Sequence, residues 1–451
     1  MRHKTRHQHV RRRHSHIQAL TVKSPADTLL LGGGGREHAM ARMLSQSDSI
    51  GRIHCAPGNP GIAALAEIHK FDIRDGAAVT DFCLSHGIDL VVIGPEAPLV
   101  AGVPDALRGA GIPVFGPGRD GARLEGSKAF SKLFMKRHGI PTAPFDICRA
   151  LGECEHAIER REPPYVIKAD GLAAGKGVFL PERKAEALDV CRELLEGRTL
   201  GDAGCTIVVE DYMPGHELTV FAVTDGKSYR ILPPSRDHKR AYDGDKGPNT
   251  GGMGAYSPVS LPGKLMDRVA DEVLRPTLAG LAAENVDYRG VIYMGLMLSD
   301  ERDGVKISVV EYNVRFGDPE AQAVLPLLSG DFGFLALKTA LGELDACPET
   351  AFSGYALCVV LAAGGYPGEF KKGDEISGLD RDAEFEDTYV FHAGTAANGD
   401  GKMLSNGGRV LGVTGVGSTF ESARERAYAR ASAVRFDGMY YRRDIGWSEC
   451  A

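Results

Sequence analysis

Short apolar segments alternate with helix-like segments between Thr28 and about Gly126. The apolar runs TLLL, RIHCAP, DLVVIG and IPVFG are separated by stretches such as EHAMARMLSQ and VPDALRGAG. Parallel strands need a crossover connection, usually a helix, so this rhythm predicts a doubly wound parallel sheet with helices on its faces. We therefore expect an α/β domain over residues 27–126.

A glycine-rich turn follows the first apolar run at Gly32–Gly35, and a helix is expected from about Glu37. Unpaired N–H groups at such a helix start favour an anionic ligand. The third glycine of GxGxxG is replaced by Glu37 or His38, so the turn is weak evidence for NAD. A tight turn needed only for packing is an equal alternative.

Residues 311–322, EYNVRFGDPEAQ, are interpreted as a strand that runs into a turn. Alternation in a strand places Glu311, Asn313 and Arg315 on one face, which we expect to continue from Val309. A carboxylate and an amide oxygen suit a hard cation such as Mg²⁺, and a neighbouring guanidinium can hold an anion. The alternative is a salt bridge at a sheet edge.

The turn after this strand carries helix-start signals. Gly317 permits a sharp bend, Asp318 is a good N-cap, and Pro319 suits the first helical position. We expect a helix that Asp318 caps.

Two lysine-bearing segments precede this region. The helix expected over 127–138 has Lys128, Lys132 and Lys136 at four-residue spacing, which usually indicates a solvated face. PYVIK, DGLAAGKG and VFLP (164–181) predict a strand, a glycine loop and a returning strand, with Lys168 able to reach a phosphate oxygen. The spacing of a Walker A loop is absent, and a plain hairpin is the alternative.

Residues 206–213 and 217–223 predict two further strands. Residues 235–258 are rich in Gly, Asp and Lys, so we expect a long lid or substrate loop, with a linker as the alternative. Beyond about Gly330, strands, a glycine-rich hairpin at 405–415 and a helix near 421–436 predict a small α+β domain that closes over the site.

Composition points to a soluble, multidomain protein. The chain has 451 residues, 43% hydrophobic content and nine cysteines without a CxxC pair. Length predicts about three domains, and the scattered cysteines favour a reducing cytoplasm. No apolar run reaches membrane-spanning length, so we expect no membrane association.

Residues 1–26 form a basic tail with seven Lys and Arg and no acid. Because the tail contributes +7 to a net charge of −7, residues 27–451 carry −14, which disfavours nucleic acid as a partner. We expect the tail to be disordered. It suits a targeting segment, an RNA-binding arm or, as we prefer, a few extra codons before the true start.

Six motifs, in this order, resemble the phosphoribosylamine–glycine ligase family of ATP-grasp enzymes. They are GGGGREHA (32–39), IGPEAPLVAG (93–102), KADGLAAGKGV (168–178), GPNTGGMGAYSP (247–258), RFGDPEAQ (315–322), and HAGT with GGRVLGVT (392–395 and 407–414). The resemblance implies an N-terminal Rossmann-like domain, an ATP-grasp domain over 127–350 with a mobile nucleotide lid at about 148–218, and a C-terminal domain over 351–451.

The resemblance also implies a reaction. The family ligates glycine to 5-phosphoribosylamine with cleavage of ATP, through a glycyl phosphate, and yields glycinamide ribonucleotide, ADP and phosphate in purine biosynthesis. The implied partners are these small molecules, in a cytoplasmic monomer or weak homo-oligomer. Because the chain ends after the third domain, we expect a monofunctional enzyme.

Site residues are implied position by position. Arg315 and Asp318 would be catalytic, and Glu311 and Asn313 would hold Mg²⁺ or Mn²⁺, although Gly295 stands where many relatives have another acid. ATP contacts are implied for Lys128, Lys168, Gly175, Gly177, Glu210, Asp211, Met213 and Glu217. Substrate contacts are implied for Gly34, Gly35, Arg36, Glu37, Asp237 and Asn249.

Three rival functions remain open at this stage. They are another ATP-grasp ligase, such as a carboxylase or a dipeptide ligase, an NAD-dependent dehydrogenase, and a nucleotide-binding protein without turnover. A general base is not evident from the residues.

Overall fold

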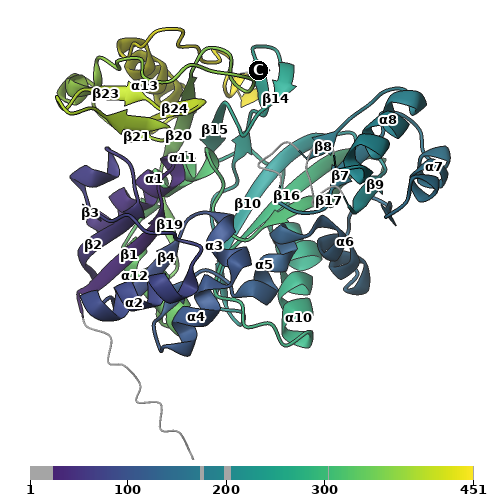
Figure 1. Ribbon diagram of the computed structural model, residues 1–451, viewed down its shortest axis with the longest axis horizontal. Coiled ribbons are helices and arrows are strands. Elements are labelled where there is room, and N and C mark those ends of the chain that lie inside the picture. Colours follow the sequence, from purple (N-terminus) through teal and green to yellow (C-terminus); the bar gives the residue numbers. More distant parts are fainter. Residues whose placement is uncertain (1–23, 173–176, 198–204, 303, 450–451) are drawn as a thin grey trace, which may run out of the picture.

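The computed structural model describes residues 24–172, 177–197, 205–302 and 304–449. Its N-terminal part contains a five-stranded sheet in the order β3-β2-β1-β4-β5, with every neighbouring pair parallel. The strands are β1 (Ala26–Gly32), β2 (Ile50–Pro57), β3 (Glu67–Ile68), β4 (Leu90–Ile93) and β5 (Val114–Phe115). The predicted parallel sheet is confirmed (Figure 1).

Helices cover both faces of this sheet. Because side chains alternate along a strand, Leu29 and Val91 join one hydrophobic core with α2 (Gly76–His86) and α4 (Val103–Gly109), whereas Leu30 and Val92 join another. The second core includes α1 (Gly35–Ser45) and α12 (Phe332–Leu341), so a helix from much later in the chain completes the layer.

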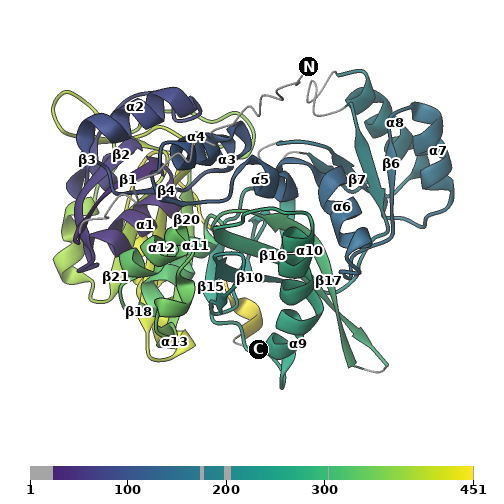
Figure 2. The same ribbon diagram turned by 90° about the horizontal axis from the view of Figure 1, so that it is seen from below.

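The central part is an antiparallel sheet in the order β11-β10-β16-β17. Its strands are β10 (His216–Thr224), β11 (Tyr229–Ile231), β16 (Gly290–Glu301) and β17 (Gly304–Asn313). The helices α6 (Lys128–Arg137), α9 (Leu265–Val269) and α10 (Arg275–Ala283) share its core, and Figure 2 shows α9 and α10 beside β16 and β17.

A smaller subdomain, called the lid from here on as a label only, projects from the central part at the right of Figure 1. Its antiparallel sheet has the order β6-β9-β7-β8, with α7 (Leu151–Glu159) and α8 (Lys184–Leu195) against it. The strands are β6 (Phe145–Cys148), β7 (Val166–Ala169), β8 (Val178–Phe179) and β9 (Ile207–Glu210). The predicted hairpin over 164–181 is present as β7 and β8, and the lid has a hydrophobic core of its own.

The C-terminal part contains a sheet in the order β12-β15-β20-β24-β21, with α13 (Phe420–Ala433) against it. Its strands are β12 (Arg236–Asp237), β15 (Gly254–Ser257), β20 (Tyr355–Ala362), β21 (Thr388–His392) and β24 (Arg409–Gly417). Smaller elements are α3 (Glu96–Ala101), α5 (Arg119–Gly126), α11 (Glu320–Val324), β18 (Leu328–Ser329), β19 (Ala351–Phe352), β22 (Thr395–Ala397) and β23 (Met403–Ser405).

Two expectations about this part were wrong. Residues 235–258 do not form a loop throughout, because β12 and β15 enter the C-terminal sheet and β13 (Arg240–Tyr242) pairs with β14 (Lys246–Asn249). The glycine-rich segment at 405–415 is not a hairpin, because β23 pairs with β22 while β24 pairs with β20 and β21.

Across the described ranges, no helix combines the length and apolar character needed to span a bilayer.

Candidate active site

A β-bulge sets the orientation of the polar row on β17. Val309 lies opposite Leu296 and Glu311 lies opposite Gly295, so Val310 is an extra residue in the strand. A bulge reverses the alternation, and for this reason Val309 and Tyr312 both face the same core. The expectation that the row of Glu311 continues from Val309 was therefore wrong, although Glu311 and Asn313 do share one face, two residues apart in the register with β16.

Two buried lysines flank a buried glutamate beside this bulge. Glu210, at the end of β9, lies 2.7 Å from Lys132 Nζ and 3.0 Å from Lys168 Nζ. Lys168 also donates to the carbonyl oxygen of Val310 (3.2 Å), which ties the lid to the bulge. Burial lowers the pKa of Lys132 to about 8, although Glu210 opposes that shift.

Glu311 is surrounded by cationic groups. Burial favours its neutral form, but Lys239, Lys168, Lys128 and Arg315 together hold its pKa below the usual value. Lys128 Nζ donates to the carbonyl oxygen of Gly171 (3.1 Å), and burial lowers its pKa. An ionised carboxylate thus faces a set of cations that can also receive phosphate oxygens.

Arg315 is held by acids from the N-terminal part. Its Nη2 lies 2.7 Å from Glu125 Oε1, and its Nε lies 3.6 Å from Glu96 Oε2. Glu125 also accepts from the backbone N–H of Val314 (2.8 Å). Burial lowers the pKa of Arg315, but Glu125 and Glu96 outweigh it and raise the pKa above its usual value.

Asp318 joins three distant segments. Its Oδ2 accepts from the backbone N–H of Arg36 (3.2 Å), its Oδ1 accepts from Gln322 Nε2 (3.0 Å), and Arg409 Nη1 lies 3.3 Å from Oδ1. Burial opposes ionisation, but Arg409 and Arg36 hold the pKa of Asp318 below its usual value. Asp318 is not the helix cap that the sequence predicted, because α11 begins at Glu320 and Pro319 takes the N-cap position.

The Gly34–Glu37 segment is supported by its own side chains. Glu37 Oε2 accepts from the backbone N–H of Gly34 (2.6 Å), while Arg36 donates to Glu37 Oε1 (2.6 Å) and to the carbonyl oxygen of Phe316 (3.0 Å). Gly35 is in close contact with α11, since an added Cβ would lie 2.5 Å from Gln322 Nε2. The side chains of Arg36 and Glu37 therefore shape the turn.

The C-terminal part contacts the same turn. Asn59 Nδ2 donates to the carbonyl oxygens of Gly33 (2.9 Å) and His392 (2.8 Å), and the N–H of His392 donates to His38 Nδ1 (2.8 Å). Arg409 Nη1 donates to the carbonyl oxygens of Gly251 and Asp318 (both 2.6 Å). Four of the six motif regions, at 32–39, 247–258, 315–322 and 392–414, therefore meet around Asp318.

A second charged cluster lies near Glu311 and consists of Asp237 on β12, Glu217 on β10 and Lys239 between β12 and β13. Lys239 forms a short ion pair with Glu217, and both contribute to the electrostatics of Asp237. Burial, together with Glu320, Glu217 and Glu311, raises the pKa of Asp237 to about 7 despite the opposing charge of Lys239.

The remaining candidate residues are more dispersed. Asp211 pairs with Arg161 (2.9 Å), Met213 is half-buried, Gly177 is buried, and Asn249 is exposed on β14. Gly175 lies outside the described residues. Gly295 is closely packed, because an added Cβ would lie 3.2 Å from the Tyr293 ring and 3.3 Å from Glu311 Cγ.

Four residues of this site were missed from the sequence as site residues: Lys132, Glu125, Lys239 and Arg409. Lys132 shares its spacing with the exposed Lys136, so the helical pattern alone does not show that it is buried. Glu125 and Arg409 lie in segments that approach β17 and Asp318 only in the folded chain.

Family models match nearly the whole chain. The N domain of phosphoribosylglycinamide synthetase matches residues 26–125, its ATP-grasp (A) domain residues 126–321, and its C domain residues 356–448. The chain belongs to the phosphoribosylglycinamide synthetase family. The membership also assigns the central sheet and the lid to the ATP-grasp fold.

Individual relatives of this synthetase family agree. A phosphoribosylamine–glycine ligase of Caulobacter vibrioides is 46% identical over 93% of this chain and 97% of its own length, and one of Streptomyces coelicolor is 47% identical over 92% and 98%. The crystal structure of the Thermotoga maritima ligase superposes with a TM-score of 0.81 at 38% identity, covering 93% of this chain and all of the other. A biotin carboxylase domain from Hydrogenobacter thermophilus, at 16% identity and a TM-score of 0.70, shares the fold alone.

Proposed function

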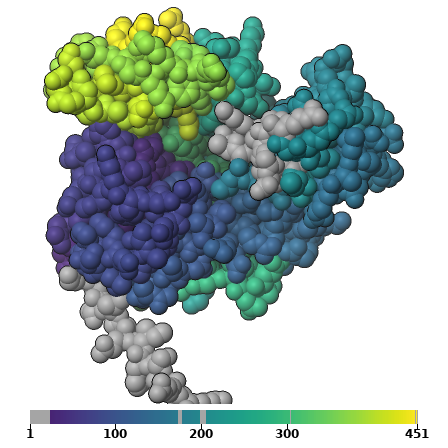
Figure 3. Space-filling model, viewed as in Figure 1, coloured from purple at the N-terminus to yellow at the C-terminus, as the bar shows by residue number. Residues whose placement is uncertain are grey.

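We propose that this protein ligates glycine to 5-phosphoribosylamine with cleavage of ATP to ADP and phosphate, and yields glycinamide ribonucleotide for purine biosynthesis. The observation that carries the proposal is the meeting of Arg36, Asp318 and Arg409 next to the lysines and the acid around the β17 bulge. Figure 3 shows the surface hollowed where the N-terminal part, the C-terminal part and the lid approach one another.

The chemistry has two steps. A glycine carboxylate oxygen attacks the γ-phosphorus of ATP, and ADP leaves with the electron pair of the broken P–O bond. The amine nitrogen of phosphoribosylamine then attacks the carbonyl carbon of glycyl phosphate, and phosphate leaves. Both steps concentrate negative charge on phosphoryl oxygens, so positioned cations supply most of the stabilisation.

Each cation has a proposed role in these steps. Lys168 and Lys128 would contact phosphate oxygens of ATP, and Arg315 would face the transferring phosphoryl group. Glu125 and Glu96 hold the Arg315 guanidinium, so it is oriented before substrate arrives.

For the nucleoside, we propose that the strand end from Glu210 through Asp211 to Met213 meets adenine. Glu217 would accept hydrogen bonds from the ribose hydroxyls, and Gly177 would allow the loop backbone to approach the phosphates. Glu217 is half-exposed, which leaves its carboxylate accessible despite the ion pair with Lys239.

The donor set at Glu311 and Asn313 fits a hard divalent cation. Glu311 is ionised because neighbouring cations lower its pKa, and an amide oxygen lies two residues away on the same face. Mg²⁺ or Mn²⁺ bound there with ATP would neutralise phosphate charge. These two side chains would orient the cation.

For the amine substrate, we propose that the backbone of the Gly34–Glu37 turn receives the ribose phosphate. Asp237 interacts electrostatically with Glu311, and we place the glycine substrate beside Asp237. The exposed Asn249 would close over the bound glycine. Asp318 would position Arg36 and Arg409 at the substrate and would be a weak base, because its pKa is lowered.

We also propose the mobile nucleotide lid at about 148–218, within an ATP-grasp domain at 127–350 that lies between domains at 27–126 and 351–451. The separate hydrophobic core of the lid supports a rigid-body motion. A cytoplasmic location and a monomeric or weakly associated state remain predictions.

The test is phosphate release from ATP with glycine and freshly prepared phosphoribosylamine, omitting each substrate in turn. Release should require all three compounds. Release with bicarbonate or a second amino acid in place of phosphoribosylamine would instead support a carboxylase or a dipeptide ligase. MgATP, but not NAD, should raise the thermal unfolding midpoint.

A further inference from the structure

Two histidines and a glutamate gather on the β2–β3 edge of the N-terminal sheet, away from the candidate active site. His54 on β2 lies opposite Glu67 on β3, and His69 follows β3 directly. His54 contacts Phe82 and His86 of α2, so the cluster lies on the face opposite α1, the helix that carries Arg36. No step proposed above uses these residues.

The donor atoms lie at metal-binding separations. His54 Nδ1 and His69 Nε2 are 3.0 Å apart, and the two Glu67 oxygens lie 3.6 Å from His54 Nδ1 and from His69 Nε2, respectively. Donors about 2.0–2.1 Å from a tetrahedral Zn²⁺ are separated by roughly 3.3 Å, so small side-chain shifts suffice. Two imidazoles and a carboxylate are a ligand set that Zn²⁺ accepts.

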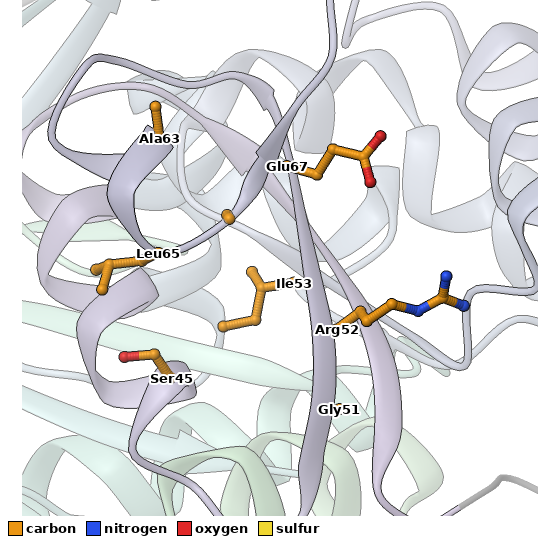
Figure 4. A pocket seen from close by; sticks show the side chains of 8 residues that line it. Ser45, Gly51, Arg52, Ile53, Ala63, Leu65 and Glu67 are labelled. Carbon is orange, nitrogen blue, oxygen red and sulfur yellow. The ribbon is translucent and has the colours of Figure 1, made fainter.

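The cluster is buried on one side and open to solvent on the other. The side chain of His54 is 3% exposed and that of His69 is 16% exposed, whereas Glu67 is 67% exposed. Figure 4 shows Glu67 and Arg52 pointing away from Ser45 and Leu65, which lie on the other side of the edge. The two imidazoles are thus held by the fold, while the exposed carboxylate lies at the solvent side.

We propose that His54, Glu67 and His69 bind one Zn²⁺ ion, with a water molecule in the fourth position. The ion would tie the two-residue edge strand β3 to β2 and so stabilise the folded chain. His86 is not assigned as a ligand, because within the described ranges only His54, Glu67 and His69 bring donor atoms within 4.8 Å of one another.

The second coordination shell is incomplete. His54 Nε2 is buried without a hydrogen-bond partner among the residues that the structure describes. Metal-ligating histidines usually donate their other N–H to an acceptor, and loss of such a partner weakens affinity about 10–100-fold. We therefore expect binding weaker than at a closed structural zinc site.

The experiment is equilibrium dialysis of the full chain against buffered Zn²⁺, with metal counted per chain. Variants Glu67→Gln and His69→Ala should each bind one fewer Zn²⁺ than the wild type at the concentration that fills the site, or need at least about tenfold more Zn²⁺. His86→Ala is the matched control and should bind as the wild type does. The five histidines of the basic tail and the acids of the nucleotide site are unchanged in every variant, so the difference isolates this cluster.

A second readout is thermal unfolding. Zn²⁺ should raise the unfolding midpoint of the wild type and of His86→Ala more than that of Glu67→Gln, while turnover without Zn²⁺ is the same in all four proteins. Glu67 is exposed, so Glu67→Gln keeps the test valid even if His69→Ala fails to fold. Equal Zn²⁺ stoichiometry and affinity in wild type and Glu67→Gln, or equal loss in His86→Ala, would overturn the proposal.

Discussion

The guanidinium of Arg315, at the end of β17, lies 2.7 Å from the carboxylate of Glu125 in α5. Glu125 also accepts from the backbone N–H of Val314, so one side chain fixes both the strand end and the charge that it presents. The nucleotide part and the N-terminal part of the site are therefore linked through this ion pair.

Replacing Glu125 should affect both stability and turnover. Glu125→Ala leaves a largely buried guanidinium and a backbone N–H without their acceptor, which should lower the free energy of unfolding by about 3 kcal/mol. Turnover should fall at least about tenfold, because Arg315 loses its orientation. Denaturant unfolding and steady-state kinetics measure the two effects, with Glu125→Gln as the milder control. Unchanged kinetics in Glu125→Ala would show that Arg315 does not depend on this pair.

Glu311→Ala should lower turnover at least about a hundredfold, because the ionised oxygen donor of the cation site is lost. Glu301→Ala, on the exposed far end of β16, is the matched control and should behave as the wild type does. The assay is phosphate release at saturating ATP and glycine. Near-normal turnover in Glu311→Ala would remove this residue from the cation site.

Arg409→Met should raise KM for phosphoribosylamine at least about tenfold and change KM for ATP by less than about threefold. The physical reason is that Arg409 holds Asp318, which in turn holds the Arg36 turn, whereas no hydrogen bond or ion pair joins Arg409 to Lys128 or Lys168 among the described residues. Arg381→Met, a half-exposed arginine of the same part, is the control. Equal effects on both KM values would show that Arg409 supports the fold in general and not the phosphoribosylamine site in particular.

The raised pKa of Asp237 gives a pH dependence of stability. The folded state holds a proton on Asp237 up to about pH 7, whereas the unfolded state releases it near pH 4. Stability from this group is therefore present below about pH 4 and is lost as pH rises to about 7, by up to about 4 kcal/mol. Over this range Asp237→Asn should gain stability relative to the wild type in urea unfolding. A difference independent of pH would contradict the shift.

The sequence was sufficient for the N-terminal parallel sheet but not for side-chain orientation near β17. The apolar alternation between Thr28 and Gly126 predicted the parallel sheet, because each buried strand must be followed by a crossover. The bulge at Val310 has no sequence signal, since it depends on pairing with Gly295 across the sheet. Strict alternation therefore assigned Val309 to the wrong face.

Charged site residues were predictable only where they lay inside a motif. Glu311, Asn313 and Arg315 stand together in the chain, and the site is built around them. Lys132 looked like a surface lysine because its partner Glu210 is 78 positions away. The strands within 235–258 were missed for a similar reason, as β15 finds its partner β20 about a hundred residues later.

Oxygen transfer from glycine to phosphate tests the proposed chemistry most directly. Glycine labelled with ¹⁸O in its carboxylate should give, after complete reaction with ATP and phosphoribosylamine, inorganic phosphate that carries one ¹⁸O atom, as mass spectrometry will measure. Phosphate without ¹⁸O would contradict the activation of glycine at this site.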